Sequence, residues 1–463
     1  MSDLPDLQTD EQVDEPEREA HLALEQDVRE AVWEQDTRWL SRTLTRLHPA
    51  DAADLLEQLS TDDFAEAVKL LHGQLPTDII IELRDEYREE AVDVLPDEAV
   101  AAVLEELDSD DVTTILEDLE DDRRERILDE LAPEDRASLE QGFAYAEDTA
   151  GRLMQREYFA APEFWTVGHA IDHARENADD LPDEFYEVYV IDPTHRLKGQ
   201  VPLATLLRTP RDVKLADIME EVQSNISVDM DQEEAAYQFQ KYSLASAPVT
   251  DDADRLLGML TVDDVVDVIQ EENTEDLLAL SGVNSADGSD TVLDSVKARA
   301  PWLAVNLVTA FIASGIISLF EGTIDQIVQL AILMPVVAAL GGNAGSQGLA
   351  VAVRAIAERE MDGDASRRAI VRETLTGLAN GVIFAIGVAA IAGFWFQSVG
   401  LALTIGIAMF ATFVWAGFSG VIVPLALRRM GADPAVASSV FVLTLTDVMA
   451  FFSFLGLATL ILL

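Results

Sequence analysis

The chain has 463 residues, with 86 acidic and 31 basic side chains, a formal net charge of −55 and no cysteine. This length predicts more than one domain, and the lack of cysteine excludes disulfides and thiolate metal sites. The acidic excess argues against nucleic acid as a partner, because like charges repel. Only nine acidic residues and seven arginines follow residue 300, so an acidic water-soluble part precedes a nearly neutral apolar part.

The acidity of the first part has two interpretations. Most of it fits a solvated surface adapted to high salt, as in a halophilic organism, since salt screens self-repulsion. A few carboxylates remain for divalent cations, which prefer oxygen ligands. The first residues, MSDLPDLQTDEQ, are polar and acidic, unlike a signal peptide. We therefore expect an acidic tail over residues 1–20 and a cytoplasmic N-terminus.

Two apolar sets with a period of twelve residues follow the tail. Leucine recurs from Leu47 to Leu131, and a second set, from Leu56 to Leu128, follows each leucine nine positions later. Asp, Pro and Ser residues that favour helix starts lie between them. Each unit is a short helix and a turn, too small to bury its own apolar stripe, so stacked copies are needed. The pattern predicts an all-α, solenoid-like domain over residues 21–146.

A repeat of fifty-nine residues comes next. VIDPTHRLKGQ begins at Val190 and VTDDADRLLGM at Val249, and each copy has two short strands followed by a helix. The pair resembles tandem CBS domains, α/β modules that commonly bind adenosine nucleotides or sense ions, over residues 147–212 and 213–270. In that family an Asp after Gly-apolar-apolar-Thr holds a ribose. Asp264 of the second copy is therefore the candidate for an ATP site, with helix capping as the alternative.

The remainder, residues 299–463, predicts an α-helical membrane domain. Its uncharged stretches are long enough for five bilayer spans, and residues 262–298 before them predict a connecting helix and linker. Basic residues occupy alternate loops, which places the N-terminus in the cytoplasm and the C-terminus outside a plasma membrane that the chain crosses several times. The expected spans are 301–320, 327–353, 374–396, 401–427 and 434–461.

Asp447 lies inside the last of these spans, where a carboxylate is costly and usually functional. The second span contains MPVVAALGGNAGSQG, whose proline and glycines indicate a kink and close helix packing. Asn343 and Gln347 lie on one helical face and need partners away from lipid. Asn343 and Asp447 are about 15 and 20 Å from the cytosolic ends of their spans, so they can meet near the midplane.

The two membrane motifs resemble those of the MgtE family of magnesium channels, as does the order of the domains. The motifs are Pro335 with GGNAGSQ, and DPAVASSVFVLTLTD ending at Asp447. The resemblance implies a homodimer in a lipid bilayer, in which Asp447 faces a central pore and holds hydrated Mg²⁺. Near this site, Ser439-Val440 and Ala450 replace the Asn-Pro and Gly common in the family. The residues expected to line the pore are Pro335, Gly341, Gly342, Asn343, Gln347 and Thr444.

The resemblance also implies regulatory Mg²⁺ between the solenoid, the CBS domains and the connecting helix, which shuts the pore when internal Mg²⁺ is high. Several acids of the connecting helix lie three residues apart without a basic neighbour, which is repulsive unless a cation or salt compensates. Two further positions, Thr114 and Ser243, lack the Asp of other members. The positions that match family sensor residues are Asp110, Glu233, Asp264, Asp267, Glu272, Glu275 and Asp276.

The predicted function is therefore magnesium uptake through a Mg²⁺-selective channel gated by cytosolic Mg²⁺, with ATP as a candidate ligand of the CBS domains and no enzyme activity. A channel for Mn²⁺ or Co²⁺ is the first alternative, since hard oxygen ligands do not exclude Mn²⁺. An intramembrane aspartyl protease is the second, and it requires two carboxylates that share a site. A CBS nucleotide sensor with a membrane anchor is the third, but it leaves Asp447 unexplained.

Overall fold

The computed structural model describes residues 15–463 except 73, 118, 120, 179–180, 183, 284–291, 358, 360 and 362. Most of the expected acidic tail and part of the expected linker therefore lie outside the described residues. The chain forms two compact units, Met1–Gln270 and Glu271–Leu463, and their boundary falls inside one helix, α15 (Val262–Leu280). Each unit is described by itself.

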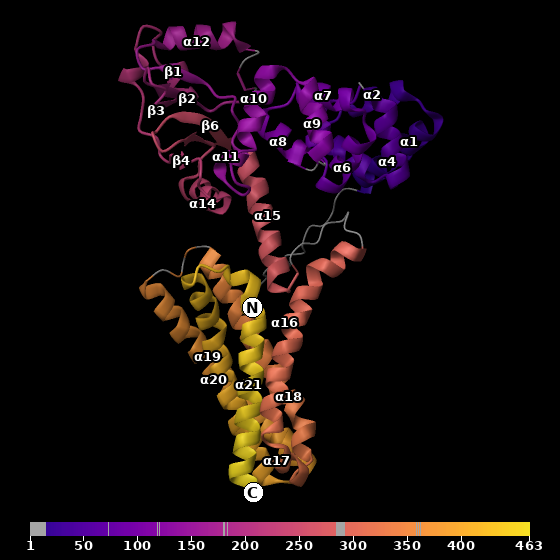
Figure 1. Ribbon diagram of the computed structural model, residues 1–463, viewed down its shortest axis with the longest axis vertical. Helices are drawn as coiled ribbons and strands as arrows, with labels where there is room; N and C mark the ends of the chain where they lie inside the picture. Colours follow the sequence, from indigo (N-terminus) through magenta and orange to yellow (C-terminus); the bar gives the residue numbers. More distant parts are fainter. Residues whose placement is uncertain are drawn as a thin grey trace, which may run out of the picture. The chain divides into compact units, whose positions relative to one another are not determined.

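The first unit begins with a stack of short helices around one apolar core (Figure 1). Small polar residues start several of them; the Ser60 hydroxyl, for example, accepts a hydrogen bond from Asp63 N at 3.2 Å at the start of α4. Every position of the two twelve-residue sets lies in this core or packs against it. The helices are α1 (Glu15–Glu34), α2 (Thr37–Leu44), α3 (Pro49–Glu57), α4 (Thr61–Leu71), α5 (Thr77–Ile81), α6 (Asp85–Val94), α7 (Asp97–Leu104), α8 (Ser109–Glu117), α9 (Asp121–Glu130) and α10 (Pro133–Gly142).

Two copies of a small α/β arrangement complete the first unit. Each copy has a three-stranded sheet in which the first pair of strands is parallel and the second is antiparallel, in the orders β1-β2-β3 and β4-β5-β6. The elements are α11 (Ala150–Leu153), β1 (Ala160–Pro162), α12 (Val167–Glu176), β2 (Glu187–Ile191), β3 (Leu197–Pro202), α13 (Leu203–Arg208), η2 (Leu215–Asp217), β4 (Ile226–Ser227), α14 (Gln232–Tyr242), β5 (Ser246–Thr250) and β6 (Leu256–Thr261).

The residues shared by the fifty-nine-residue repeats form the tight turns of the two hairpins. Asp192 Oδ1 accepts from Arg196 N at 3.1 Å, and Asp251 Oδ1 accepts from Arg255 N at 2.9 Å. The two turns also meet, since Arg196 and Arg255 form an antiparallel bridge. The sequence repeat therefore reflects the same turn chemistry at two places.

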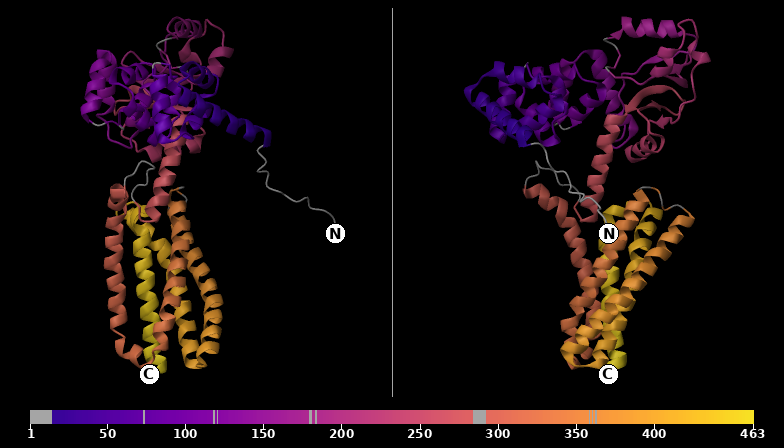
Figure 2. Two further views of the ribbon diagram at one scale, coloured as in Figure 1. Left: turned by 90° about the vertical axis from the view of Figure 1, so that its right-hand side faces the viewer. Right: turned by 180° about the vertical axis from the view of Figure 1, so that it is seen from behind.

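Long helices α16, α18, α19, α20 and α21 of the second unit are apolar enough to cross a membrane. Helix α20 packs against α18, α19 and α21, while α16 packs against α21 (Figure 1). The C-terminus and α17 lie at one end of this bundle, and the C-terminal ends of α18 and α20 lie at the other (Figure 1; two further views in Figure 2). The helices are α16 (Val292–Ser318), α17 (Glu321–Gln326), α18 (Gln329–Ala357), α19 (Asp364–Phe396), α20 (Val399–Arg429) and α21 (Pro434–Leu462).

Several helix ends differ from the predicted limits. Helix α1 includes Glu15, inside the expected tail, and α15 ends at Leu280, within the region predicted as a connecting helix and linker. Helix α16 begins at Val292 and contains Pro301, and α19 begins at Asp364, ten residues before its apolar stretch. Hydropathy marks only the part of a helix that suits lipid, whereas polar residues continue the same helix into water.

Candidate functional site

The glycine-rich stretch of α18 packs against α21. Gly345 is buried, and a Cβ built on it would lie 2.9 Å from Val442 Cγ1 and 3.0 Å from Thr446 Cγ2. Both distances are shorter than ordinary van der Waals contact, so the two helices approach at a distance that suits glycine. The close packing predicted for the second span is present, and its partners are α21 and α20, since a Cβ on Gly341 would lie 2.5 Å from Thr412 Cγ2 of α20.

The polar residues of the same motif lie on another face of α18. Pro335, Asn343 and Gln347 are exposed in the single chain, and Asp447 of α21 is half-buried. Thr444, one turn before Asp447, donates its hydroxyl hydrogen to Val440 O at 2.7 Å. Exposed amides and a carboxylate are unsuited to hydrocarbon, so this face requires water or protein rather than lipid. The meeting of Asn343 with Asp447 stays a prediction.

A tryptophan that the sequence analysis did not select lies beside this region. Trp415 of α20 donates its indole N–H to Leu445 O of α21 at 3.2 Å. An indole N–H inside an apolar helix needs an acceptor. This requirement is the one feature of the sequence that could have identified Trp415. The contact fixes α20 to the turn of α21 that precedes Asp447.

Carboxylates from three helices of the first unit form an acidic cluster. Burial and the charge of Asp264 raise the pKa of Asp111 to about 7, and burial raises the pKa of Asp264 to about 6. Burial and the Asp264 charge also raise the pKa of Asp110 well above its usual value. The cluster consists of Asp85 on α6, Asp110 and Asp111 on α8, and Asp263, Asp264 and Asp267 on α15.

One buried cation lies beside this cluster. Arg88 of α6 forms an ion pair with Asp85 at 2.5 Å and donates to Leu83 O at 3.3 Å. Burial and neighbouring carboxylates raise the pKa of Asp267, and Arg88 partly offsets that shift. Among the described residues, these carboxylates and the neighbouring Asp108 outnumber the Arg88 guanidinium, so the cluster retains a strong attraction for a further cation.

A second acidic group lies within the second unit. Burial, together with the charges of Asp433, Glu272 and Glu275, raises the pKa of Asp276 to about 6. Asp433 begins α21, where its Oδ1 accepts from Ala435 N at 2.8 Å. The fold thus groups three predicted sensor residues of α15 with Asp433, which had not been predicted as a site residue.

The other predicted regulatory residues lie on two helices of the first unit besides α8. Asp264 and Asp267 of α15 come together with Asp110, and Glu233 lies in the first turn of α14. The Thr261 hydroxyl donates to Asp264 Oδ2, as expected for a helix start. The ribose-binding role of Asp264 stays a prediction.

Metal coordination at these groups would depend on water. Among the residues that the structure describes, no three His, Asp or Glu side chains are placed to enclose a metal ion directly. Mg²⁺ keeps several of its waters and is often bound through one or two carboxylates. Paired aspartates such as Asp110 and Asp264 therefore suit a hydrated Mg²⁺ better than a dehydrated Ca²⁺ or Zn²⁺.

Three parts of the chain match models of known families. Residues 334–457 match the MgtE divalent cation transporter, residues 47–148 the MgtE intracellular N domain, and residues 215–271 a CBS domain. The magnesium transporter MgtE of Thermus thermophilus is 32% identical over 455 residues, which cover 94% of this chain and 98% of that protein. The chain belongs to the MgtE family. Its resemblance to that family, first drawn from the membrane motifs, is confirmed.

A second curated relative agrees with this assignment. The magnesium transporter MgtE of Enterococcus faecalis is 32% identical over 326 residues, covering 70% of this chain and 72% of that protein. Among solved structures, the cytosolic domain of the Mg²⁺ channel MgtE in complex with ATP is 34% identical and covers 52% of this chain and 98% of that one, with a TM-score of 0.48. MgtE membership and the five apolar helices confirm the predicted multidomain membrane architecture.

Proposed function

We propose that this MgtE-family protein is a passive Mg²⁺ channel of the plasma membrane that mediates magnesium uptake. The main support for this proposal is Asp447, a carboxylate inside an apolar helix that packs against the glycine-rich motif of α18. At an effective dielectric constant near 20, a carboxylate and a divalent ion about 5 Å apart attract each other by several kcal/mol before desolvation. Such a group favours divalent over monovalent ions.

The pore requires a second copy of the chain. Asn343, Gln347 and Pro335 are exposed in the single chain, and a homodimer axis beside α18 and α21 would remove them from lipid. Two Asp447 carboxylates, one from each copy, would then hold one hydrated ion between them. This arrangement also explains why the mainly uncharged α21 keeps a costly carboxylate.

The orientation follows from the arginines. Arg354 ends α18, and Arg428 and Arg429 end α20, so the positive-inside rule places these ends in the cytoplasm and the C-terminus outside. Reporters fused after Leu463 and inserted near Asp364 should therefore lie on opposite sides of the membrane. Reporters on the same side would contradict the five-span topology.

The acidic cluster and the acidic group around Asp276 would form the Mg²⁺ sensor that closes the channel. Carboxylates with raised pKa values repel one another, and a bound cation removes that repulsion. Mg²⁺ should therefore protect residues 15–280 of the full chain from protease, and replacement of Asp264 and Asp267 by Asn should weaken the effect. Equal protection by KCl alone would identify these acids as a salt-adapted surface. ATP at Asp264 is a secondary proposal, supported by the Gly258-Met-Leu-Thr261 sequence before it.

Ion flux in liposomes tests the proposed transport directly. The full chain is reconstituted, and uptake of Mg²⁺, Mn²⁺, Co²⁺ and Ca²⁺ is compared at equal gradients without an energy source. Mg²⁺ should pass fastest and without ATP. Faster Mn²⁺ or Co²⁺ uptake would favour the alternative cation, and the absence of all flux, together with cleavage of an added membrane peptide, would favour the protease.

A further inference from the structure

Helix α8, which carries Asp110 and Asp111, is held at its first residue by a carboxylate from a distant part of the chain. Ser109 N and Ser109 Oγ both donate to Glu157 Oε2, at 3.1 and 2.8 Å. Arg156 N in turn donates to Ser109 Oγ at 2.8 Å. Ser109 is 8% exposed, so water competes little for these bonds. The negative charge also suits the N-terminal end of a helix.

The last turn of α8 is held by the same segment. Glu117 forms an ion pair with Arg152, a residue of α11. The Arg152 guanidinium also lies over the Phe143 ring, 4.5 Å from its centroid, which favours one position of the charge. Residues 152–157 therefore contact α8 at both ends, and Asp110 and Asp111 lie between the two contacts.

Residues 152–157 are in turn hydrogen-bonded to β6, the strand that leads into α15. Gln155 N donates to Met259 O at 2.9 Å, and Met259 N donates to Gln155 O at 2.8 Å. A Cβ on the neighbouring Gly258 would lie 2.5 Å from Gln155 O, so the close approach of the two backbones requires glycine at this position. Strand β6 then ends at Thr261, three residues before Asp264.

We propose that Glu157 is a positioning residue that sets the Mg²⁺ concentration at which the acidic cluster is occupied. Glu157 binds Ser109 of α8, and the nearby Gln155–Met259 pair binds the strand before α15. Together these contacts fix the position of α8 relative to the start of α15. Asp110 therefore stays opposite Asp264 even though the two carboxylates repel each other. This inference rests on the proposed Mg²⁺ gating and adds to it a contact that is neither a cation ligand nor part of the pore.

The expected consequence follows from population shift. Mg²⁺ binds both helices only while α8 is in place, and the apparent dissociation constant equals the intrinsic one divided by the fraction of chains in that arrangement. Loss of a hydrogen-bonded charge at Glu157 lowers this fraction. More Mg²⁺ is then needed for the same occupancy, while the ligands themselves are unchanged.

The test uses Glu157→Gln in the full chain, with Ser109→Ala as a second variant and Glu163→Gln as the matched control. Glu163 lies six residues further along the chain, and its substitution removes the same charge. Mg²⁺ is titrated while two midpoints are measured: protection from proteinase K in detergent and closure of Mg²⁺ flux in liposomes. Glu157→Gln and Ser109→Ala should each raise both midpoints about tenfold, which equals about 1.4 kcal/mol. Glu163→Gln should leave both midpoints unchanged, and Glu157→Asp should restore part of the parent behaviour.

The outcomes separate this inference from the proposed gating. A parent protein that responds to Mg²⁺, together with variants that share its midpoint, overturns the role of Glu157 and leaves the gating intact. A parent that shows no response to Mg²⁺ overturns both. If Glu157→Gln does not fold, Ser109→Ala decides the question, because it removes one hydroxyl and keeps every charge. A double variant whose midpoint shift equals that of either single variant supports a shared contact.

Discussion

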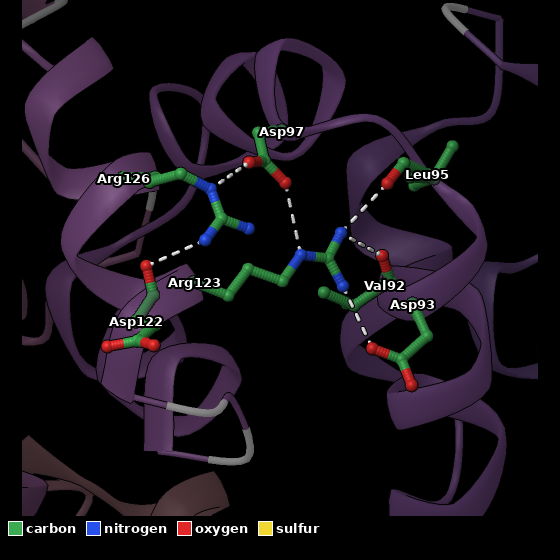
Figure 3. A network of polar contacts seen from close by, with 7 residues as sticks. All are labelled: Val92, Asp93, Leu95, Asp97, Asp122, Arg123 and Arg126. Atoms are coloured by element: carbon green, nitrogen blue, oxygen red, sulfur yellow. Dashed lines mark hydrogen bonds and ion pairs between the residues drawn. The ribbon is translucent and has the colours of Figure 1, made fainter.

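Two groups of aspartates in the first unit have opposite surroundings. Asp97 begins α7, and its carboxylate accepts from Arg123 Nε at 3.1 Å and from Arg126 Nε at 3.0 Å (Figure 3). These arginines, with the hydrogen bond to Arg126 as the larger cause, lower the pKa of Asp97. Asp111 lies on the next helix, α8, in the acidic cluster, and its pKa is raised to about 7 by burial and by like charges.

This difference distinguishes aspartates whose charge is neutralised by arginines of the fold from aspartates whose charge requires protons or cations. The Arg123 guanidinium also donates to Val92 O and Leu95 O, at 2.7 and 2.8 Å, and so binds the end of α6 (Figure 3). That network is satisfied without any ion. The acidic cluster contains more carboxylates than its single arginine can neutralise, and it becomes satisfied only when protons or cations arrive.

The largest effect is expected from breaking the satisfied network. Arg123→Ala removes a side chain that is 15% exposed and takes one donor away from each of two carbonyl oxygens and two carboxylates, those of Asp93 and Asp97. Local stability of α6, α7 and α9 should fall by about 3 kcal/mol, measured by hydrogen–deuterium exchange of the full chain. Arg126→Ala is the matched control; its side chain is 59% exposed, and it should cost below about 1 kcal/mol. Equal losses would contradict the special role of Arg123.

Asp447 extends the comparison to a carboxylate inside a long apolar helix. Asp447→Asn keeps the shape of the side chain and removes its charge, so the proposed dimer would lose two charges. Mg²⁺ flux in liposomes should fall at least tenfold, equivalent to about 1.4 kcal/mol, with the melting temperature in detergent unchanged or slightly higher. Asp325→Asn, in α17 outside the long apolar helices, should conduct like the parent. A folded Asp447→Asn protein with parental flux would show that this aspartate is not the pore ligand.

The same substitution at Asp97 and at Asp111 should change the local stability in opposite directions. Asp97→Asn weakens two ion pairs and should lower local stability by about 1 kcal/mol, whereas Asp111→Asn removes repulsion and should raise it by about 1 kcal/mol without Mg²⁺. Exchange rates of the α7 and α8 peptides measure the two changes. With saturating Mg²⁺, the benefit of Asp111→Asn should disappear. Changes of the same sign would mean that the two groups do not differ electrostatically.

The smallest effect is a dependence on pH. Asp111 and Asp264 have raised pKa values, about 7 and about 6, so the folded state holds more protons than the unfolded state between pH 4 and 7. Their contribution to stability is complete below about pH 4 and is lost as pH rises from about 4 to about 7. Without Mg²⁺, exchange from α8 should therefore slow by a few fold between pH 8 and 5.5, after correction for intrinsic rates. Asp111→Asn should weaken this pH dependence and leave the part that comes from Asp264, and full retention of the effect would contradict this origin.

The sequence by itself determined the features that depend on local periodicity. Twelve-residue spacing placed the core of the helical stack, repeated Asp and Gly residues marked two equivalent hairpins, and uncharged stretches marked the five long helices. Asp447 was visible because a single carboxylate is conspicuous in an apolar stretch. The helix ends were less well predicted, since polar residues continue α16 and α19 beyond their apolar parts.

The membership of the acidic groups depended on tertiary structure. Spacing along α15 predicted that its acids share a face, but it could not tell that Asp111 approaches Asp264 or that Asp433 approaches Asp276. Nor could it separate these acids from Asp97 with its arginine partners. In a chain with 86 acidic residues, the type of residue carries little information about a site. The environment of the residue carries that information, because burial and neighbouring charge decide whether a carboxylate is satisfied or needs a cation. Burial and neighbouring charge in turn depend on how distant segments of the chain pack together.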